Sequence, residues 1–193
     1  MSFFGDLPEP VDDRAEILRA RPQRYPGVPT DWIRAVTLPW SRTLGEGAEV
    51  LVALDRVRCW PDGVSLDIDV FAKHAIVDVR RMGGLWGHSH GVPRSPGELL
   101  LGIRYADGQR VSTVDELPPG TDRLRMSAYG GSGSPFHFRY EFYMSPLPPE
   151  GPVSIVVRWL DKDLPETVTD LDGAAIREAA ANAVEVWPDL PPA

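Results

Sequence analysis

The residues best suited to chemistry in this sequence are two histidines that lie two positions apart in a glycine-rich stretch. Residues 83–91 have the sequence GGLWGHSHG, which places His88 and His90 just after Trp86. Alternate side chains of an extended segment point to the same side, so both imidazoles can approach one metal ion. A divalent transition metal needs a third and usually a fourth ligand. The pair by itself therefore predicts only half of such a site.

A third imidazole is available elsewhere in the chain, from His137 or from His74. Two interpretations stay open. Either His88, His90 and His137 hold a divalent transition metal, or the stretch is a surface loop in which glycines lower the rigidity and the histidines bind nothing. We favour the loop, and we expect no other cofactor.

A second group of polar side chains shares one face of an expected strand. In PFHFRYEFYM (135–144), His137, Arg139 and Glu141 alternate with aromatic residues. A patch of alternating sign usually serves solubility and cross-strand pairing, with each pair worth about 0.2–1 kcal/mol. The alternative is a surface that binds a partner or a ligand, for which the candidate residues are Trp86, Arg104, Arg139 and Glu141.

Two carboxylates, Asp67 and Asp69, stand on one face of the strand VSLDIDVF (64–71). Paired carboxylates can serve acid–base chemistry or bind calcium. On the outer face of a hairpin strand they are far more often solvated charges, and we expect that here.

The single cysteine, Cys59, ends an apolar strand and is expected to be a buried structural thiol. One thiol cannot form a disulfide within the chain, which favours a reducing compartment, and we expect the protein to be cytoplasmic. The first residues, MSFFGDLPEPVDD, do not resemble a signal peptide.

The overall charge argues against two classes of partner. The formal net charge is −8 and the isoelectric point is about 5.0, so the surface repels phosphate backbones and anionic lipids. No run of eighteen apolar residues exists that could span a membrane. We expect neither nucleic acid nor membrane as a partner.

The chain is dominated by short segments of alternating character, separated by many of its 20 prolines and 18 glycines. This pattern is typical of an all-β domain. A Trp60–Gly63 turn and an Ala106–Gly108 turn each join two such segments into a hairpin, and Gly130–Ser134 is expected to be a flexible turn. The clearer strands are expected at 50–55, 64–71, 99–105, 135–144 and 152–160, and weaker ones at 32–38, 75–80 and 123–129.

One helix is expected near the end of the chain. The alanine-rich residues 169–187 change from a period of two to a period of 3.6. Asp170 or Asp172 can cap the first turn, and Pro188 ends the helix after about three to four turns.

Together these elements predict a mainly β protein, a two-sheet antiparallel sandwich with a C-terminal helix. We expect an extended N-terminal arm over residues 1–31 and a single sandwich domain over residues 32–193. The alternative is an α+β fold with a single sheet and the helix on one face.

The second half of the chain, over about residues 95–187, resembles a family of uncharacterised small β-rich proteins of actinobacteria. The resemblance implies a compact β-rich fold and no known activity. The strings that carry it are YADGQR (105–110), GGSGS (130–134), FHFRYEFYMSPLPPEGP (136–152), LPET (164–167) and LDGAAIREAA (171–180).

No complete catalytic constellation is present, so we expect no enzymatic activity. The favoured function is a non-catalytic protein interaction or assembly module, with a protein partner or self-association. The alternatives are a metal-binding protein that uses His88 and His90, and a binder of carbohydrates or other small ligands that uses tryptophan and the Arg/Glu face.

Overall fold

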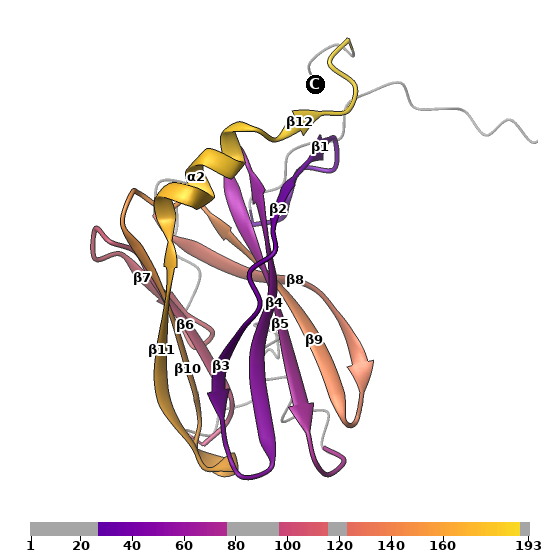
Figure 1. The fold of residues 1–193 in the computed structure, drawn as a ribbon, viewed down its shortest axis with the longest axis vertical. Helices are drawn as coiled ribbons and strands as arrows, with labels where there is room; N and C mark the ends of the chain where they lie inside the picture. Colours follow the sequence, from indigo (N-terminus) through magenta and orange to yellow (C-terminus); the bar gives the residue numbers. More distant parts are fainter. Residues whose placement is uncertain (1–26, 77–96, 116–122, 190–193) are drawn as a thin grey trace, which may run out of the picture.

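The structure is a computed structural model that describes residues 27–76, 97–115 and 123–189. Within these residues the chain forms a β-sandwich from a six-stranded and a four-stranded sheet, with a small two-stranded sheet at one end (Figure 1). Every strand pair is antiparallel. The two-sheet prediction is confirmed, and the single-sheet alternative is wrong.

The six-stranded sheet has the order β2-β4-β5-β9-β8, and β3 also pairs with β4. Its strands are β2 (Val36–Leu38), β3 (Arg42–Glu46), β4 (Val50–Trp60), β5 (Gly63–Ala72), β8 (Arg125–Ser134) and β9 (His137–Ser145). The four-stranded sheet has the order β11-β10-β6-β7. Its strands are β6 (Leu100–Arg104), β7 (Arg110–Ser112), β10 (Pro152–Trp159) and β11 (Leu164–Asp172), and a short 3₁₀ helix, η2 (Leu160–Lys162), joins the last two.

The β4–β5 hairpin forms as its alternation predicts. Trp60 pairs with Gly63, so Pro61 and Asp62 make a two-residue turn. A side chain on Gly63 would collide with the Tyr143 hydroxyl, since the Cβ position lies 2.4 Å from that oxygen. The apolar side chains of β5 face inward and are buried, namely Val64, Leu66, Ile68 and Val70.

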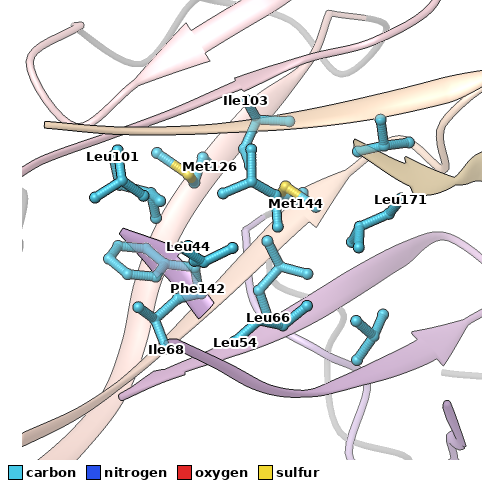
Figure 2. Close-up of a cluster of buried hydrophobic side chains, with 14 of the residues drawn as sticks. Leu44, Leu54, Leu66, Ile68, Leu101, Ile103, Met126, Phe142, Met144 and Leu171 are labelled. Atoms are coloured by element: carbon cyan, nitrogen blue, oxygen red, sulfur yellow. The ribbon is translucent and has the colours of Figure 1, made fainter. Parts of the chain in front are cut away.

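One hydrophobic core lies between the two sheets. It joins side chains of β4, β5 and β9 on one side to those of β6 and β10 on the other. Figure 2 shows several of them pointing toward one another, among them Leu66, Phe142 and Ile103. Val153, Ile155, Val157 and Trp159 of β10 are all buried, as their alternation predicts.

The helix is shorter than predicted. It is α2 (Gly173–Ala181), and the first residues of the predicted helix, 169–172, instead end strand β11, which pairs with β10. Of the two proposed caps, Asp172 accepts hydrogen bonds from the backbone N–H groups of Ala174 and Ala175. Cross-strand pairing of the β-branched Thr-Val-Thr segment outweighed the helical pattern before the cap. The prediction that Pro188 ends the helix is wrong, because the helix already stops before Asn182.

Helix α2 closes one end of the sandwich and buries Ile176, Ala179 and Ala180 in the common core. Beyond it, β12 (Val184–Glu185) pairs with β1 (Ile33–Arg34) (Figure 1). In the described part of the chain, no helix is long and apolar enough to cross a membrane.

Two further differences from the sequence predictions concern glycine-rich and polar strands. Strand β3 was not predicted, and the expected turn at Gly130–Ser134 is wrong, because these residues form the second half of β8. The turn lies at Pro135 and Phe136. Gly133 permits the close approach of β9, since a Cβ there would lie 2.3 Å from the His137 carbonyl oxygen.

Three predictions fall outside the described residues in whole or in large part. They are the arm at 1–31, which is described only from Gly27, the strand at 75–80, and the histidine-containing stretch at 83–91.

Candidate functional site

The outer face of the six-stranded sheet carries a connected set of polar side chains, centred on β5 between β4 and β9. The registers of these strands place Arg56 opposite Asp67, Asp67 opposite Glu141, and Asp69 opposite Arg139. We call this set the polar ladder. Its members are Asp55, Arg56, Arg58, Ser65, Asp67, Asp69, Tyr129, His137, Arg139 and Glu141.

The first half of the polar ladder gathers around Arg58. Its Nη2 atom lies 2.9 Å from Asp67 Oδ1, 2.8 Å from the Tyr129 hydroxyl and 3.1 Å from Glu141 Oε2. Arg56 Nε lies 3.0 Å from the other oxygen of Asp67. Asp67 and Glu141 stand directly opposite each other, and like charges in such positions repel. The bridging guanidinium of Arg58 offsets this repulsion.

The second half of the polar ladder gathers around Asp69. Arg139 donates two hydrogen bonds to its carboxylate, from Nε at 2.8 Å and from Nη2 at 2.7 Å. This is the bidentate geometry that makes arginine–carboxylate pairs specific as well as strong. His137 Nε2 lies 3.0 Å from Asp69 Oδ1, and Arg139 also contacts Asp55 at 3.0 Å.

The two central carboxylates are buried, which contradicts the expectation that Asp67 and Asp69 are solvated charges. Their side chains are 3% and 6% exposed, whereas the side chain of Arg56 is 41% exposed. Arg56, Arg58 and Arg139 bind these carboxylates directly and keep part of their own side chains in water. A buried carboxylate stays ionised only when it is paired and hydrogen-bonded, and both of these are.

The environment fixes the protonation of several members. Burial by itself raises the pKa of Asp69, but the hydrogen bonds from Arg139 and His137 outweigh it and hold that pKa below its usual value. Burial raises the pKa of Tyr129 to about 12. Burial lowers the pKa of Arg58, yet its acidic and phenolic partners raise it above normal overall. At neutral pH these three groups therefore present hydrogen-bonding atoms of fixed charge.

Aromatic rings flank the polar ladder at both ends. At the turn end, the Arg58 guanidinium lies 5.7 Å from the centre of the Trp60 ring, and Trp60 packs edge-on against Tyr143. At the opposite end, Phe71 and His137 stack in parallel, with ring centres 4.5 Å apart. Phe71 is 42% exposed and the neighbouring Phe136 is 54% exposed, so aromatic surface is accessible at this end.

The structure brings some predicted site residues together and separates others. Arg139 and Glu141 belong to the polar ladder. Arg104 lies on β6 of the other sheet, where its guanidinium donates a hydrogen bond to Ser154 Oγ, at 3.3 Å, and forms no ion pair with a described residue. The structure therefore separates Arg104 from Arg139 and Glu141, because the two sheets turn their outer faces away from each other. Trp86 lies outside the described residues.

The metal hypothesis stays a prediction. His137 Nε2 lies 3.0 Å from Asp69 Oδ1, and His74 Nε2 lies 3.5 Å from Glu49 Oε1. The two imidazoles therefore contact different carboxylates. No group of three metal-ligating side chains occurs among the residues that the structure describes. His88 and His90 lie outside them.

Sequence reasoning missed Arg58, the centre of the first half. The signal was available, because Arg56 and Arg58 alternate with apolar residues in β4 and the predicted turn sets the hairpin register. Counting back from that turn places Arg58 opposite Ser65 and diagonal to Asp67.

Cys59, the neighbour of Arg58, points to the opposite face. It is fully buried, and burial raises the pKa of its thiol to about 12. The prediction of a buried thiol is confirmed.

Comparison with known proteins finds no matching family model, no matching curated protein and no matching solved structure. The resemblance to small actinobacterial proteins stays a prediction.

Proposed function

We propose that this protein is a non-catalytic protein interaction module, and that its partner docks on the outer face of the six-stranded sheet. The observation that carries the proposal is the polar ladder, in which arginines are held in place by buried carboxylates. Interface residues that dominate binding are enriched in arginine and aromatic side chains. Both types gather here, with Phe71 exposed on this face and Phe136 exposed in the adjoining turn between β8 and β9.

Preorganisation supports the same proposal. An arginine that is already held by two or more partners loses little conformational freedom when a protein binds over it. Arg58 and Arg139 each contact at least two acidic side chains and keep 27% and 29% of their side-chain surface exposed. These side chains can contact a partner without first being ordered.

We further propose that the protein acts in the cytoplasm. The free thiol of Cys59 supports this, because such thiols persist in reducing compartments. The net charge of −8 favours a protein partner over nucleic acid.

Site-specific photocrosslinking tests the proposal. A benzophenone amino acid is placed at Phe136 and, as a matched control, at Val168 on the outer face of the four-stranded sheet, since both residues are 54% exposed. We expect one protein to be crosslinked from position 136 and not from position 168. The captured protein is then purified, and its affinity is measured for the wild type, for Arg139→Ala and for the control Arg104→Ala.

We expect Arg139→Ala to weaken the affinity at least tenfold and Arg104→Ala to leave it unchanged. Crosslinking of the same proteins from both positions would overturn the proposal, as would equal binding by all three variants.

A further inference from the structure

Strand β8 ends the six-stranded sheet on the side away from β4, and it pairs only with β9 among the described strands. In Figure 1 its second half lies at the free side of the sheet, drawn in orange. An edge strand presents backbone N–H and C=O groups that can bind another extended chain.

The other edges of the sandwich are protected in ways that β8 is not. Strand β11 carries Pro165 and exposed acidic residues, both of which discourage strand addition. Strands β2 and β7 have 3 residues each. Strand β3 lies against β11, where Thr167 Oγ1 donates to the Leu44 carbonyl oxygen. By contrast, β8 has 10 residues, and none of its last five is charged or a proline.

A bulge at Tyr129 divides β8 into two parts. The first part lies near other segments, because a Cβ on Gly27 would come within 2.7 Å of Ser127 Oγ. The second part, Gly130–Ser134, is regular and its last three residues are exposed. This second part is the accessible edge.

We propose that this edge binds an extended segment of the partner protein as an additional antiparallel strand, an inference that rests on the proposed function. Antiparallel addition follows the pairing of every other strand in the fold. Main-chain hydrogen bonds supply affinity in such complexes, and alternate side chains supply specificity.

The inner face of the edge favours apolar side chains. A Cβ on Gly133 would lie 2.9 Å from Cδ2 of Phe138, so the half-buried Phe138 ring lies against this glycine. Gly131 stands on the same inner face, opposite the buried Tyr140. An apolar side chain facing Gly133 would pack against the Phe138 ring, and one facing Gly131 would extend the apolar inner face.

The outer face of the edge favours a basic side chain at one position. The carboxylate of Glu141 lies over Gly130, where a Cβ would be 3.1 Å from Oε2. That oxygen already binds Arg58, whereas Oε1 makes no hydrogen bond with a described residue. A lysine or arginine opposite Gly130 would complete the pairing, and the net charge of −8 attracts a basic segment.

A second copy of this chain fits the edge poorly. If two β8 edges paired with each other, glycines and serines would face glycines and serines, and the Phe138 ring would gain no apolar neighbour. The expected pattern in the partner is therefore apolar, polar, apolar, basic, written from its N-terminal end.

Labelled ten-residue peptides test the inference on the full-length protein. One contains Val-Thr-Val-Arg at its centre, the second replaces arginine with glutamate, and the third replaces both valines with serine. Fluorescence anisotropy measures affinity, and hydrogen–deuterium exchange shows which backbone amides become protected. We expect the arginine peptide to bind at least tenfold more tightly than the other two and to protect residues 129–134.

Two protein variants sharpen the result. Glu141→Gln removes one charge and should abolish the preference for arginine over glutamate. Ser132→Lys places a charge on the exposed edge and should abolish binding, whereas Val168→Lys on β11 should not. Thermal unfolding and circular dichroism establish whether each variant is folded. If Ser132→Lys does not fold, Glu141→Gln and the peptide series still test the inference.

Protection on β4 and β5 without protection on β8 would overturn strand addition and leave the proposed docking face intact. Equal binding of all three peptides, or no binding, would also overturn it. The proposed function itself is tested separately, by the crosslinking of a partner from position 136.

Discussion

The two sheets turn very different outer faces to their surroundings. On the six-stranded sheet, three arginines and four carboxylates form one connected set, and its two central carboxylates are buried. On the four-stranded sheet, Arg104 hydrogen-bonds to Ser154 and forms no ion pair with a described residue, and Val168 is exposed. Both faces follow the same alternation in sequence. On the six-stranded sheet, the register of β4, β5 and β9 places opposite charges together, and this pairing turns the outer-face polar residues into one connected surface.

The largest effect is expected from removing the arginine that bridges the first half of the polar ladder. Arg58→Ala leaves the buried Asp67 and its opposite neighbour Glu141 without their shared cation, and breaking a buried pair in this way costs about 3 kcal/mol. Arg104→Ala on the other sheet should cost less than about 0.5 kcal/mol. Urea unfolding measures both. Equal costs would show that the two faces do not differ energetically.

A smaller effect on stability is expected from Gly→Ala substitutions at two positions, one in each sheet. In Gly133→Ala the new Cβ would lie 2.3 Å from a backbone oxygen and 2.6 Å from the Phe138 Cα, so β8 and β9 must move apart, at about 1–3 kcal/mol. In Gly102→Ala on β6 the nearest atoms lie at 3.7 Å, an ordinary contact, so the free energy of unfolding should be unchanged or slightly higher. Thermal or urea unfolding of both variants distinguishes these outcomes, and a tolerated Gly133→Ala would contradict the tight packing of the β8–β9 hairpin.

The smallest expected effect is a dependence of the protein's stability on pH, through Asp69. The pKa of Asp69 is lower in the folded protein than the usual value of about 3.9 for the unfolded chain. Its ionised form therefore stabilises the fold above that value, and this contribution is lost as the pH falls through the lower folded pKa. The stability gap between the wild type and Asp69→Asn should be widest near neutral pH and should shrink below about pH 5.

Asp170→Asn on the four-stranded sheet is the control for this experiment, since that exposed carboxylate makes no ion pair with a described residue. Its gap to the wild type should stay small. A gap for Asp69→Asn that stays constant from pH 7 to pH 3 would contradict the role of the Arg139–Asp69 pair.

Much of the fold was predictable because its strands alternate strictly. The inward residues of β5 and β10 were all identified from the sequence, since a one-residue shift would expose them. Residues 164–172 were not assigned to a strand, because their pairing with β10 does not show in their own composition and their capping aspartate resembles a longer helix start. The strand at Gly130–Ser134 was missed for a similar reason, as glycine favours turns except where a neighbouring backbone approaches closely.

The candidate site was predictable only residue by residue. Arg139 and Glu141 were identified from the alternation of one strand, but their connection to Arg58 depends on the order β4-β5-β9, which no local pattern contains. Asp67 and Asp69 were predicted to be solvated charges, because alternation shows which face of the sheet a side chain is on. It does not show which residues of the neighbouring strands lie opposite. Burial of a charge is decided by its partners on neighbouring strands.

The mobility of the arginine side chains tests most directly whether the outer face of the six-stranded sheet is preorganised. Nitrogen-15 relaxation at the Nε–H groups of Arg58, Arg139 and Arg104 measures it on the isolated protein. Arg58 and Arg139 should show order parameters near those of rigid backbone, about 0.85, and Arg104 should fall below about 0.6. Low values at all three arginines would contradict a preorganised face and remove the main support for partner binding there.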